Sequence, residues 1–429
     1  MRPHRDLVPA LALLLSAAVA GCADSGSAGD WGGTVRDSAG VAVVDNEARG
    51  AWDAGEAWRF RRVVEVGGAS EDSVPFGNVA DIAVDSRDRI YVLDRSVPAV
   101  LVFDASGRHL RTLGSAGRGP GELGAAVAAV LTAPGDTLLV PDPSNGRIQR
   151  FGPDGATLAS VPLALEGRVP VHWRVTPDGR PLVQLRSTGP DAGRAGGPED
   201  LVRVAAAGEE ESAAVLRLPP GEGYQVRPGR APRIRLFAPE PLWDVLGDDR
   251  FVHATNDAYR LEIVRGGETV RIIRKEHTAS RVGPAEKEAA REMMRGLFEE
   301  NGVPPGVVEQ FMESVTVADR YPAFSTLMAG PRGTILVQRV REIAPDTGGG
   351  DAPLDPRDLG APEWDVFDPE GRFLGTVSLP ERFTPMTWRG DRVFGVQRGA
   401  LDVPSVVGLE IVDPAEDVAG DADGSRDEA

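Results

Sequence analysis

Histidine side chains are the first groups in this 429-residue chain that could hold a catalytic metal ion. A catalytic zinc site needs about three protein ligands that converge on one point. The histidines beyond residue 22 are His109, His172, His253 and His277. The sequence contains a repeated unit of four short strands, described below. His109 and His277 fall on or after the outermost strand of such a unit, so only His172 and His253 can approach the centre that the units share. The sequence therefore predicts structural histidines and no zinc site.

Carboxylates near the first strands of these units are the second candidates. Asp81, Asp85 and Asp244 could converge on a calcium ion, which prefers oxygen ligands. Each of the three also fits a turn or strand-end role within its own unit, where a short acidic side chain accepts backbone hydrogen bonds. We favour the structural role and predict no metal and no cofactor, with calcium as the alternative.

Other catalytic signatures are missing from the sequence. It contains no G-x-S-x-G elbow for a nucleophilic serine. The glycine-rich stretch Gly114–Gly121 is followed by no Lys-Ser/Thr pair and opens no helix, so it does not predict a phosphate loop. The formal charge of −18 repels phosphate backbones and disfavours a nucleic-acid partner. A binding protein is favoured over an enzyme, with a metal-dependent hydrolase or lyase as the alternative.

Aromatic and charged side chains near the first strands and on long loops are the candidates for binding. Trp173, Trp243 and Trp388 could stack on a ligand ring, although we expect such residues to fill the wedges between units. The candidate binding residues are Arg118, Glu122, Trp173, Arg174, Trp243, Asp244, Met293, Phe298 and Phe311.

The N-terminal residues predict export. Arg2 and Arg5 precede the apolar stretch Leu7–Ala18, which is too short to span a bilayer. The stretch ends in Val19-Ala20-Gly21-Cys22 and resembles the bacterial lipoprotein cleavage box. The resemblance implies a signal peptide over residues 1–21, acylation of Cys22 and anchoring in the cell envelope; Ala23, the next residue, favours the outer membrane. An ordinary signal peptide with a chance cysteine is the alternative.

A four-stranded repeat dominates the rest of the chain. The 52 glycines and 35 prolines suit many short strands joined by tight turns. Four short strands begin at Ala80, and a second copy follows from residue 129; four antiparallel strands in about 45 residues make one propeller blade. Residues 76–163 resemble NHL-type six-bladed β-propellers, in the segments Asp81–Asp85, Gly114–Leu123 and Asn145–Phe151.

Six such units can be counted from their first hairpins. Their first strands are anchored at Ile82, Val130, Trp173, Trp243, Leu327 and Met386. The last unit has only three strands, and the alternating segment Trp58–Val66 can supply the fourth. The sequence therefore predicts an all-β, six-bladed β-propeller closed by an N-terminal strand, which leaves no exposed sheet edge. Gly40–Asp45 is one further strand without a predicted place.

One segment is helical. Pro284–Glu300 is rich in helix-forming residues, and a second start at Pro304-Pro305 predicts a helical hairpin inserted between blades four and five. The expected organisation is a tether and N-terminal extension at 22–57 and a propeller at 58–413, with the helical insertion at 281–320. A disordered acidic tail follows at 414–429.

The long connections are expected on one face. They are Ser187–Pro198, Pro219–Pro239, Pro284–Val315 and Ile343–Pro362. All of them join a second strand to a third strand or one blade to the next. The turns from first to second and from third to fourth strands are expected to be uniformly short. One-sided elaboration favours a binding surface. We expect a monomeric, membrane-anchored propeller that binds a small-molecule ligand or a protein partner against the helices, away from the membrane; a scaffold in envelope assembly is a further alternative.

Overall fold

The computed structural model describes residues 31–53, 55–68, 74–125, 127, 129–187, 199–205, 212–225, 232–300, 302–343, 360–399 and 402–412. The predicted signal peptide with Cys22, the predicted acidic tail and most of the long connections at 187–198 and 343–362 lie outside these residues. The described part is all-β, with only two α-helices. None of its helices has the length and apolar character needed to cross a membrane.

Six sheets each contain four antiparallel strands, which are successive in the sequence in the first five sheets. The first sheet contains β4 (Val79–Val84), β5 (Ile90–Asp94), β6 (Ala99–Phe103) and β7 (His109–Leu113). The second contains β8 (Leu131–Ala133), β9 (Thr137–Asp142), β10 (Arg147–Phe151) and β11 (Thr157–Pro162). The third contains β12 (Val169–Val175), β13 (Pro181–Arg186), β14 (Glu199–Arg203) and β15 (Ala213–Leu218). The fourth sheet contains β18 (Pro241–Leu246), β19 (Arg250–Thr255), β20 (Arg260–Arg265) and β21 (Glu268–Lys275). The fifth contains β23 (Thr326–Ala329), β24 (Ile335–Val340), β25 (Gly360–Phe367) and β26 (Phe373–Ser378). The sixth contains β27 (Phe383–Arg389), β28 (Arg392–Arg398), β29 (Pro404–Val412) and β3 (Arg59–Gly67).

The six sheets form a ring. The first strands of neighbouring sheets contact one another: β4 touches β8, β8 touches β12, β12 touches β18, β18 touches β23, and β27 touches β4. Second strands are buried on both faces because a neighbouring sheet covers each side, which explains the continuous apolar run of β5. Outer strands such as β7 are largely exposed. Burial is thus greatest in the second strands and falls from there to the rim of the ring.

The N-terminal strand β3 completes the last sheet, as predicted. It pairs antiparallel with β29, from Gly67 opposite Ser405 to Arg59 opposite Val412. Val64 and Val66 point into the core between the first and last sheets. Gly408, opposite Val64, is required here because a Cβ atom would lie 2.6 Å from the Val64 side chain. The pairing joins the two ends of the ring.

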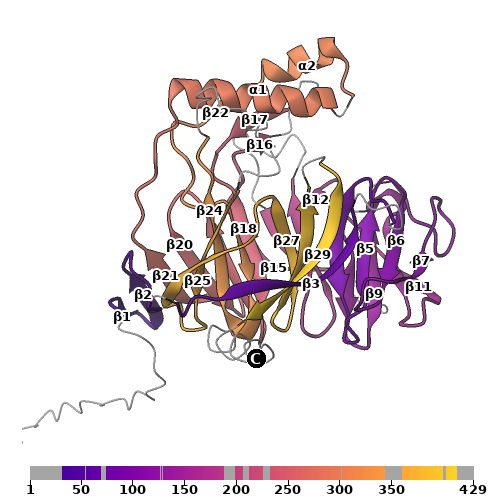
Figure 1. Ribbon diagram of the computed structural model, residues 1–429, viewed down its shortest axis with the longest axis horizontal. Coiled ribbons are helices and arrows are strands. Elements are labelled where there is room, and N and C mark those ends of the chain that lie inside the picture. Colours follow the sequence, from indigo (N-terminus) through magenta and orange to yellow (C-terminus); the bar gives the residue numbers. More distant parts are fainter. Residues whose placement is uncertain are drawn as a thin grey trace, which may run out of the picture.

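The strand that the sequence could not place lies on the outside of the fourth sheet. β2 (Val41–Asn46) pairs in parallel with β21, and β1 (Thr34–Ser38) pairs with β2 as a hairpin. The chain then continues along the fifth sheet, where the Ala51 and Trp52 amides donate to the carbonyls of Phe373 and Leu374. Residues 41–67, which we call the rim segment, therefore follow the outer edges of three successive sheets (Figure 1).

Asn46 fastens this rim segment. Its amide nitrogen donates to the carbonyls of Arg274 and Gly371, both at 3.0 Å. Its amide oxygen accepts from Trp31 Nε1 at 2.9 Å and from the Phe373 amide at 2.7 Å. One buried side chain thus holds together the N-terminal hairpin, the fourth sheet and the fifth sheet.

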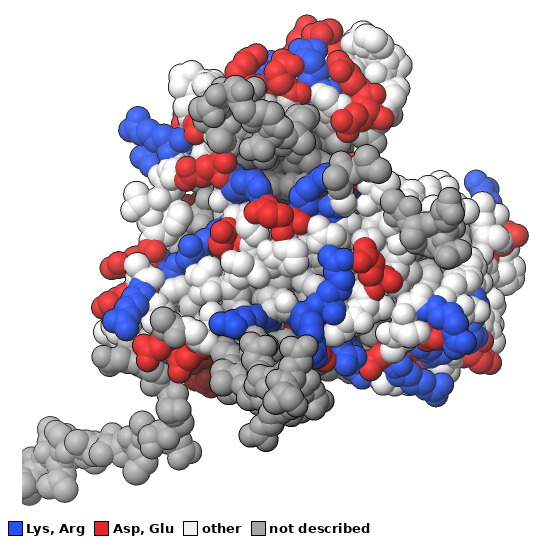
Figure 2. Space-filling model, in the orientation of Figure 1, with Lys and Arg blue, Asp and Glu red and all other residues white. Residues whose placement is uncertain are grey.

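The helices stand apart from the ring (Figure 1). α1 (Pro284–Glu300) and α2 (Pro305–Met312) pack on a small sheet of β16 (Tyr224–Gln225), β17 (Arg233–Leu236) and β22 (Val315–Val317), and we call these five elements the cap. In sequence, α1 and α2 lie between the fourth and fifth sheets. Acidic side chains gather on the outside of the cap in Figure 2, while its apolar side chains form a core of their own.

Candidate binding channel

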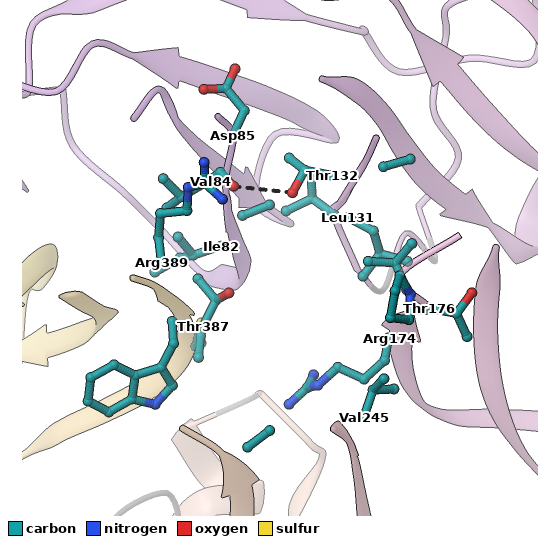
Figure 3. Close-up of a pocket in the computed structure, with 18 of the residues that line it drawn as sticks. Ile82, Val84, Asp85, Leu131, Thr132, Arg174, Thr176, Val245, Thr387 and Arg389 are labelled. Atoms are coloured by element: carbon teal, nitrogen blue, oxygen red, sulfur yellow. Dashed lines mark hydrogen bonds between the residues drawn. The ribbon is translucent and has the colours of Figure 1, made fainter. Parts of the chain in front are cut away.

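Two cavities open along the centre of the ring. The larger, of about 630 Å³, is lined by the starts of first strands and by the ends of second strands. The smaller, of about 550 Å³, is lined by the ends of first strands and the short turns that follow them (Figure 3). We call them the cap-side and turn-side cavities, because connections between sheets leave from the end of the ring that carries the cap.

Most long connections lie at the cap end. The connection from β15 to β18 contributes β16 and β17, and that from β21 to β23 contributes both helices and β22. At the other end the turns are short, with one exception: the connection from β14 to β15 spans Val204–Ser212, which the sequence pattern did not predict. The two ends of the ring therefore differ strongly in elaboration.

Four side chains line both cavities and form the waist of the channel. They are Asp81 on β4, Arg174 on β12, Met328 on β23 and Met386 on β27. Two methionines and two opposite charges thus separate the cavities. Prolines lie near the starts of first strands, for example Pro241 and Pro385. They fit this position because one edge of a first strand faces the channel, where no neighbouring strand would accept a hydrogen bond from a backbone amide.

Arg174 projects into the channel (Figure 3). Its Nε donates to Asp244 Oδ1 at 2.7 Å, and its Nη1 donates to the Trp173 carbonyl at 3.0 Å. Asp244 in turn accepts from the amides of Val245 and Ala329, so it links the fourth sheet to the fifth. Arg174 Nη2 makes no hydrogen bond within the described residues, and 27% of the side chain is exposed to the channel.

Asp81 has no ion-pair partner within 4 Å among the described residues. Its two carboxylate oxygens accept from the amides of Ile82 and Val130, both at 2.9 Å. Burial raises the pKa of this carboxyl to about 6, although the two amides and the more distant Arg174 and Arg95 guanidinium groups favour its charged form. Asp81 therefore exchanges a proton near neutral pH.

His172 also lines the cap-side cavity. Its ring packs edge-on against Trp243, with centroids 5.1 Å apart. Burial lowers the pKa of His172 well below its usual value, and the neighbouring Arg174 charge lowers it further. The imidazole is therefore neutral at pH 7.

The rim of the cap-side cavity is polar. Arg186 donates from Nε to Glu199 at 2.7 Å and from Nη2 to Glu240 at 3.0 Å. Burial raises the pKa of Glu240, which also accepts from the Gly223 amide. Arg95 is exposed and uses its Nε to donate to the Val127 carbonyl at 3.1 Å. Arg186 is thus neutralised, whereas the Arg95 guanidinium is open to the cavity.

Four of the predicted binding residues lie along the channel: Trp173, Arg174, Trp243 and Asp244. The tryptophans among them pack in the wedges between sheets, as we expected. The Trp243 indole is held there by its Nε1, which donates to Gln184 at 2.8 Å. Trp388, which lines the turn-side cavity, packs on Phe60. The tryptophans thus shape the channel mainly as its walls.

The loop residues Arg118 and Glu122 lie outside both cavities. The Glu122 carboxylate folds back to accept from the Gly119 amide at 2.6 Å, and a Cβ atom at Gly117 would collide with it. Glu122 therefore shapes its own loop. Arg118 is exposed on the same loop.

Phe298, Phe311 and Met312, three of the predicted contact residues of the helices, pack within the cap. Met293 is buried but does not belong to the apolar core of the cap. Phe298 stacks on Phe311 with ring centroids 5.3 Å apart. Met312, at the end of α2, is buried in the same core. These apolar residues stabilise the cap itself.

The candidate metal ligands are dispersed. Among the described residues, no group of three histidine, cysteine, aspartate or glutamate side chains is placed to hold a metal ion. Asp85 lines the turn-side cavity, and its buried carboxylate accepts from Arg89 Nε at 2.6 Å and from the Tyr91 hydroxyl at 2.9 Å. Asp81 and Asp244 lie within first strands, and each accepts one backbone amide of its own strand and one of the next sheet, so they join neighbouring sheets; the prediction of a turn or strand-end role within their own units was wrong for these two.

Comparison with known proteins agrees with this architecture. A model of the family DUF5128, described as a 6-bladed beta-propeller, matches residues 69–125. No curated protein matches the sequence. The chain is a β-propeller. The family match covers much less than half of the chain, so it supports the fold of the propeller and not membership of that family.

Several solved structures resemble this propeller. A DUF4221 family member from Bacteroides vulgatus is 12% identical, with 84% of this chain and 100% of that chain covered and a TM-score of 0.50. A putative exported protein from Bacteroides fragilis is 10% identical, covers 86% and 99% of the two chains, and has a TM-score of 0.48. Virginiamycin B lyase from Staphylococcus aureus is 9% identical, with 83% and 100% covered and a TM-score of 0.42. At such identities the likeness concerns the fold alone.

Proposed function

We propose that this protein is a six-bladed propeller of the bacterial envelope, anchored through acylated Cys22, that binds a small ligand in its cap-side cavity. The cavity carries the proposal: it is roomy, lies on the channel axis and opens at the elaborated end of the ring. Ligand sites are typically concave, largely apolar and supplied with a few convergent polar groups. Here those groups are Asp81, Arg95, His172 and Arg174.

The placement of the N-terminal strands supports the proposed anchoring. β1 lies at the end of the molecule away from the helices of the cap (Figure 1). A lipid anchor joined to residues just before β1 would therefore leave the cap-side cavity facing away from the membrane. The six sheets and the resemblance of residues 76–163 to NHL-type propellers support the count of six blades.

Two substitutions on one strand test the proposal. Thr384 and Thr387 both belong to β27, but Thr384 lines the cap-side cavity and Thr387 lines the turn-side cavity. Each is changed to Trp, and the proteins are purified from their own envelope and examined by native mass spectrometry. We expect a bound small molecule in the wild type and in Thr387→Trp but not in Thr384→Trp. A ligand-free wild type, or equal retention by both variants, would contradict the proposal.

A further inference from the structure

We infer that the ligand of the cap-side cavity carries an anionic oxygen group, a carboxylate or a phosphate, which binds the open guanidinium groups of Arg95 and Arg174 and is repelled by the charged Asp81 carboxylate. This inference rests on the proposed function, because it assumes that the cavity is the binding site. It names the chemistry of the ligand that the cavity selects.

The cavity contains guanidinium nitrogens that have no hydrogen-bond partner within the described residues. Arg95 uses only Nε in a hydrogen bond, so both of its terminal nitrogens are unpaired within the described residues. Arg174 likewise leaves Nη2 unpaired at the waist. The third arginine of the lining, Arg186, is already held by Glu199 and Glu240. Guanidinium groups with free ends suit carboxylate and phosphate oxygens, which they bind by charge-assisted hydrogen bonds.

The acids of the cavity carry the second step. Only two carboxylates line it, and Glu240 is paired with Arg186. Asp81 has backbone amides as its hydrogen-bond donors. It is therefore the negative charge that repels an incoming anion at the waist. When Asp81 is protonated, the repulsion disappears and the attraction of both arginines remains.

The surroundings of Asp81 set the direction of the pH dependence. The charged groups that act on it are Arg174 on β12 and Arg95 after β5. His172 is neutral, and Asp244 is paired with Arg174. Because the pKa of Asp81 is about 6, the neutral form becomes common as the pH falls below 7. An anion should therefore bind more tightly in mild acid.

The walls indicate the rest of the ligand. Leu242, Leu327 and Trp243 line the cap-side cavity, and Val171 at its mouth is an exposed apolar residue. A cavity of about 630 Å³ is much larger than one carboxylate group. An anionic group at the waist joined to an apolar body towards the cap would fill it.

The test measures binding of simple probes by calorimetry, using the chain from residue 22 with Cys22→Ser, which lacks both the predicted signal peptide and the acylation site. The probes are hexanoate, its uncharged analogue hexanamide and inorganic phosphate, each at about pH 5.5 and about pH 7.5 and at one ionic strength. An aliphatic carboxylate stays mostly ionised at the lower pH. We expect hexanoate to bind roughly tenfold more tightly at the lower pH, and hexanamide to bind much more weakly at both. Phosphate binding with the same pH trend would extend the ligand class to phosphate esters.

Three substitutions assign the effect. Asp81→Asn should bring hexanoate binding at the higher pH up to the level at the lower pH, and so remove the pH dependence. Arg95→Gln should weaken binding at both pH values by roughly tenfold. Arg265→Gln, which changes an exposed arginine outside both cavities, is the matched control and should leave binding unchanged.

The outcomes separate this inference from the proposed function. The anionic ligand class is overturned if neither hexanoate nor phosphate binds, or if their binding does not respond to Asp81→Asn and Arg95→Gln. If Thr384→Trp still abolishes retention of the native ligand in that case, the cavity remains the binding site. If the native ligand is retained by Thr384→Trp, the proposed function itself fails.

Discussion

Asp365 is a buried carboxylate with four hydrogen-bond donors. It is 1% exposed and accepts from Lys275 Nζ at 2.9 Å, from the Tyr259 hydroxyl at 2.7 Å and from Arg339 Nε at 2.9 Å. Lys275 and Arg339 hold the pKa of Asp365 below its usual value despite burial. Because Lys275 and Tyr259 come from the fourth sheet, this network ties the fourth and fifth blades together.

Asp365→Asn should therefore destabilise the protein by about 3 kcal/mol at pH 7, because it leaves a buried Lys275 ammonium without its counter-ion. The pKa is lowered in the folded state, so the stabilisation is present above the unfolded pKa and is lost as the pH falls. The gap between wild type and variant should thus narrow below about pH 4. Urea denaturation across this pH range checks the expectation. Asp402→Asn, in the half-exposed pair with Arg382, is the control and should cost less than about 1 kcal/mol.

The contribution of Asp81 to the free energy of unfolding depends on pH in the opposite direction. Its pKa is raised in the folded state to about 6, so its protonated form favours folding at low pH, and this advantage is lost as the pH rises through about 6. Asp81→Asn cannot ionise. Its free energy of unfolding, relative to wild type, should rise by up to about 3 kcal/mol between about pH 4 and pH 7.5. A constant offset is expected from the amide hydrogen bond that asparagine cannot replace; parallel pH profiles would rule out a titrating Asp81.

At the scale of elements, the strands could be predicted but not all of their partners. Alternating residues bounded by turn signals marked the first strands and the closing strand β3, because the last sheet was one strand short. β2 could not be placed, since its pattern does not state which edge it joins and its parallel partner β21 lies far along the chain. Helical periodicity marked α1 and α2, but it could not show that their apolar faces form a separate core with β17 and β22.

The channel was predictable to a similar degree. Trp173, Arg174, Trp243 and Asp244 were found because they belong to first strands, which face the centre of any propeller. Arg95 and Arg186 were missed because they come at or just after the ends of second strands, where the sequence looks like an ordinary surface. The position after each second strand, which shares the cap end of the ring, is the signal that would have found them.

Neighbouring valines on β3 test ring closure. Val64 is buried between the first and last sheets, whereas Val63 is 37% exposed. Val64→Asp places an unpaired charge in this core and should destabilise the protein by more than about 3 kcal/mol. Val63→Asp should change the stability by less than about 0.5 kcal/mol. Thermal unfolding followed by circular dichroism measures both, and equal effects would show that β3 contributes little to closure.

For the whole molecule, the part of the cap that lies between the fourth and fifth sheets, namely α1, α2 and β22, is expected to be dispensable for folding. The two segments that connect this part to the ring meet where the Val282 amide donates to the Asp319 carbonyl at 3.0 Å. Replacing Pro284–Val317 with a short Gly-Ser linker should therefore leave the ring folded, with a melting temperature within a few degrees of the parent. Loss of cooperative melting would show that the cap is part of the folding unit.

The proposed anchor is tested by fractionation. A single acyl chain binds membranes only marginally, so stable anchoring needs the several chains of an acylated cysteine. Cys22→Ser should move the protein from the membrane pellet to the soluble envelope fraction. Wild type and variant in the same fraction would contradict lipid anchoring.

Closure by β3 also dictates the order in which the molecule can be finished. Arg61 and Glu410, which pair across this seam, are 349 residues apart in the sequence. β3 is synthesised before every other strand of the ring, yet its partner β29 is the last strand of the ring to be made. Such a distant contact forms late, and both edges stay unpaired until then. The pairing of β3 with β29 therefore requires the complete chain. A chain interrupted before residue 404 can fold individual blades but cannot close the ring.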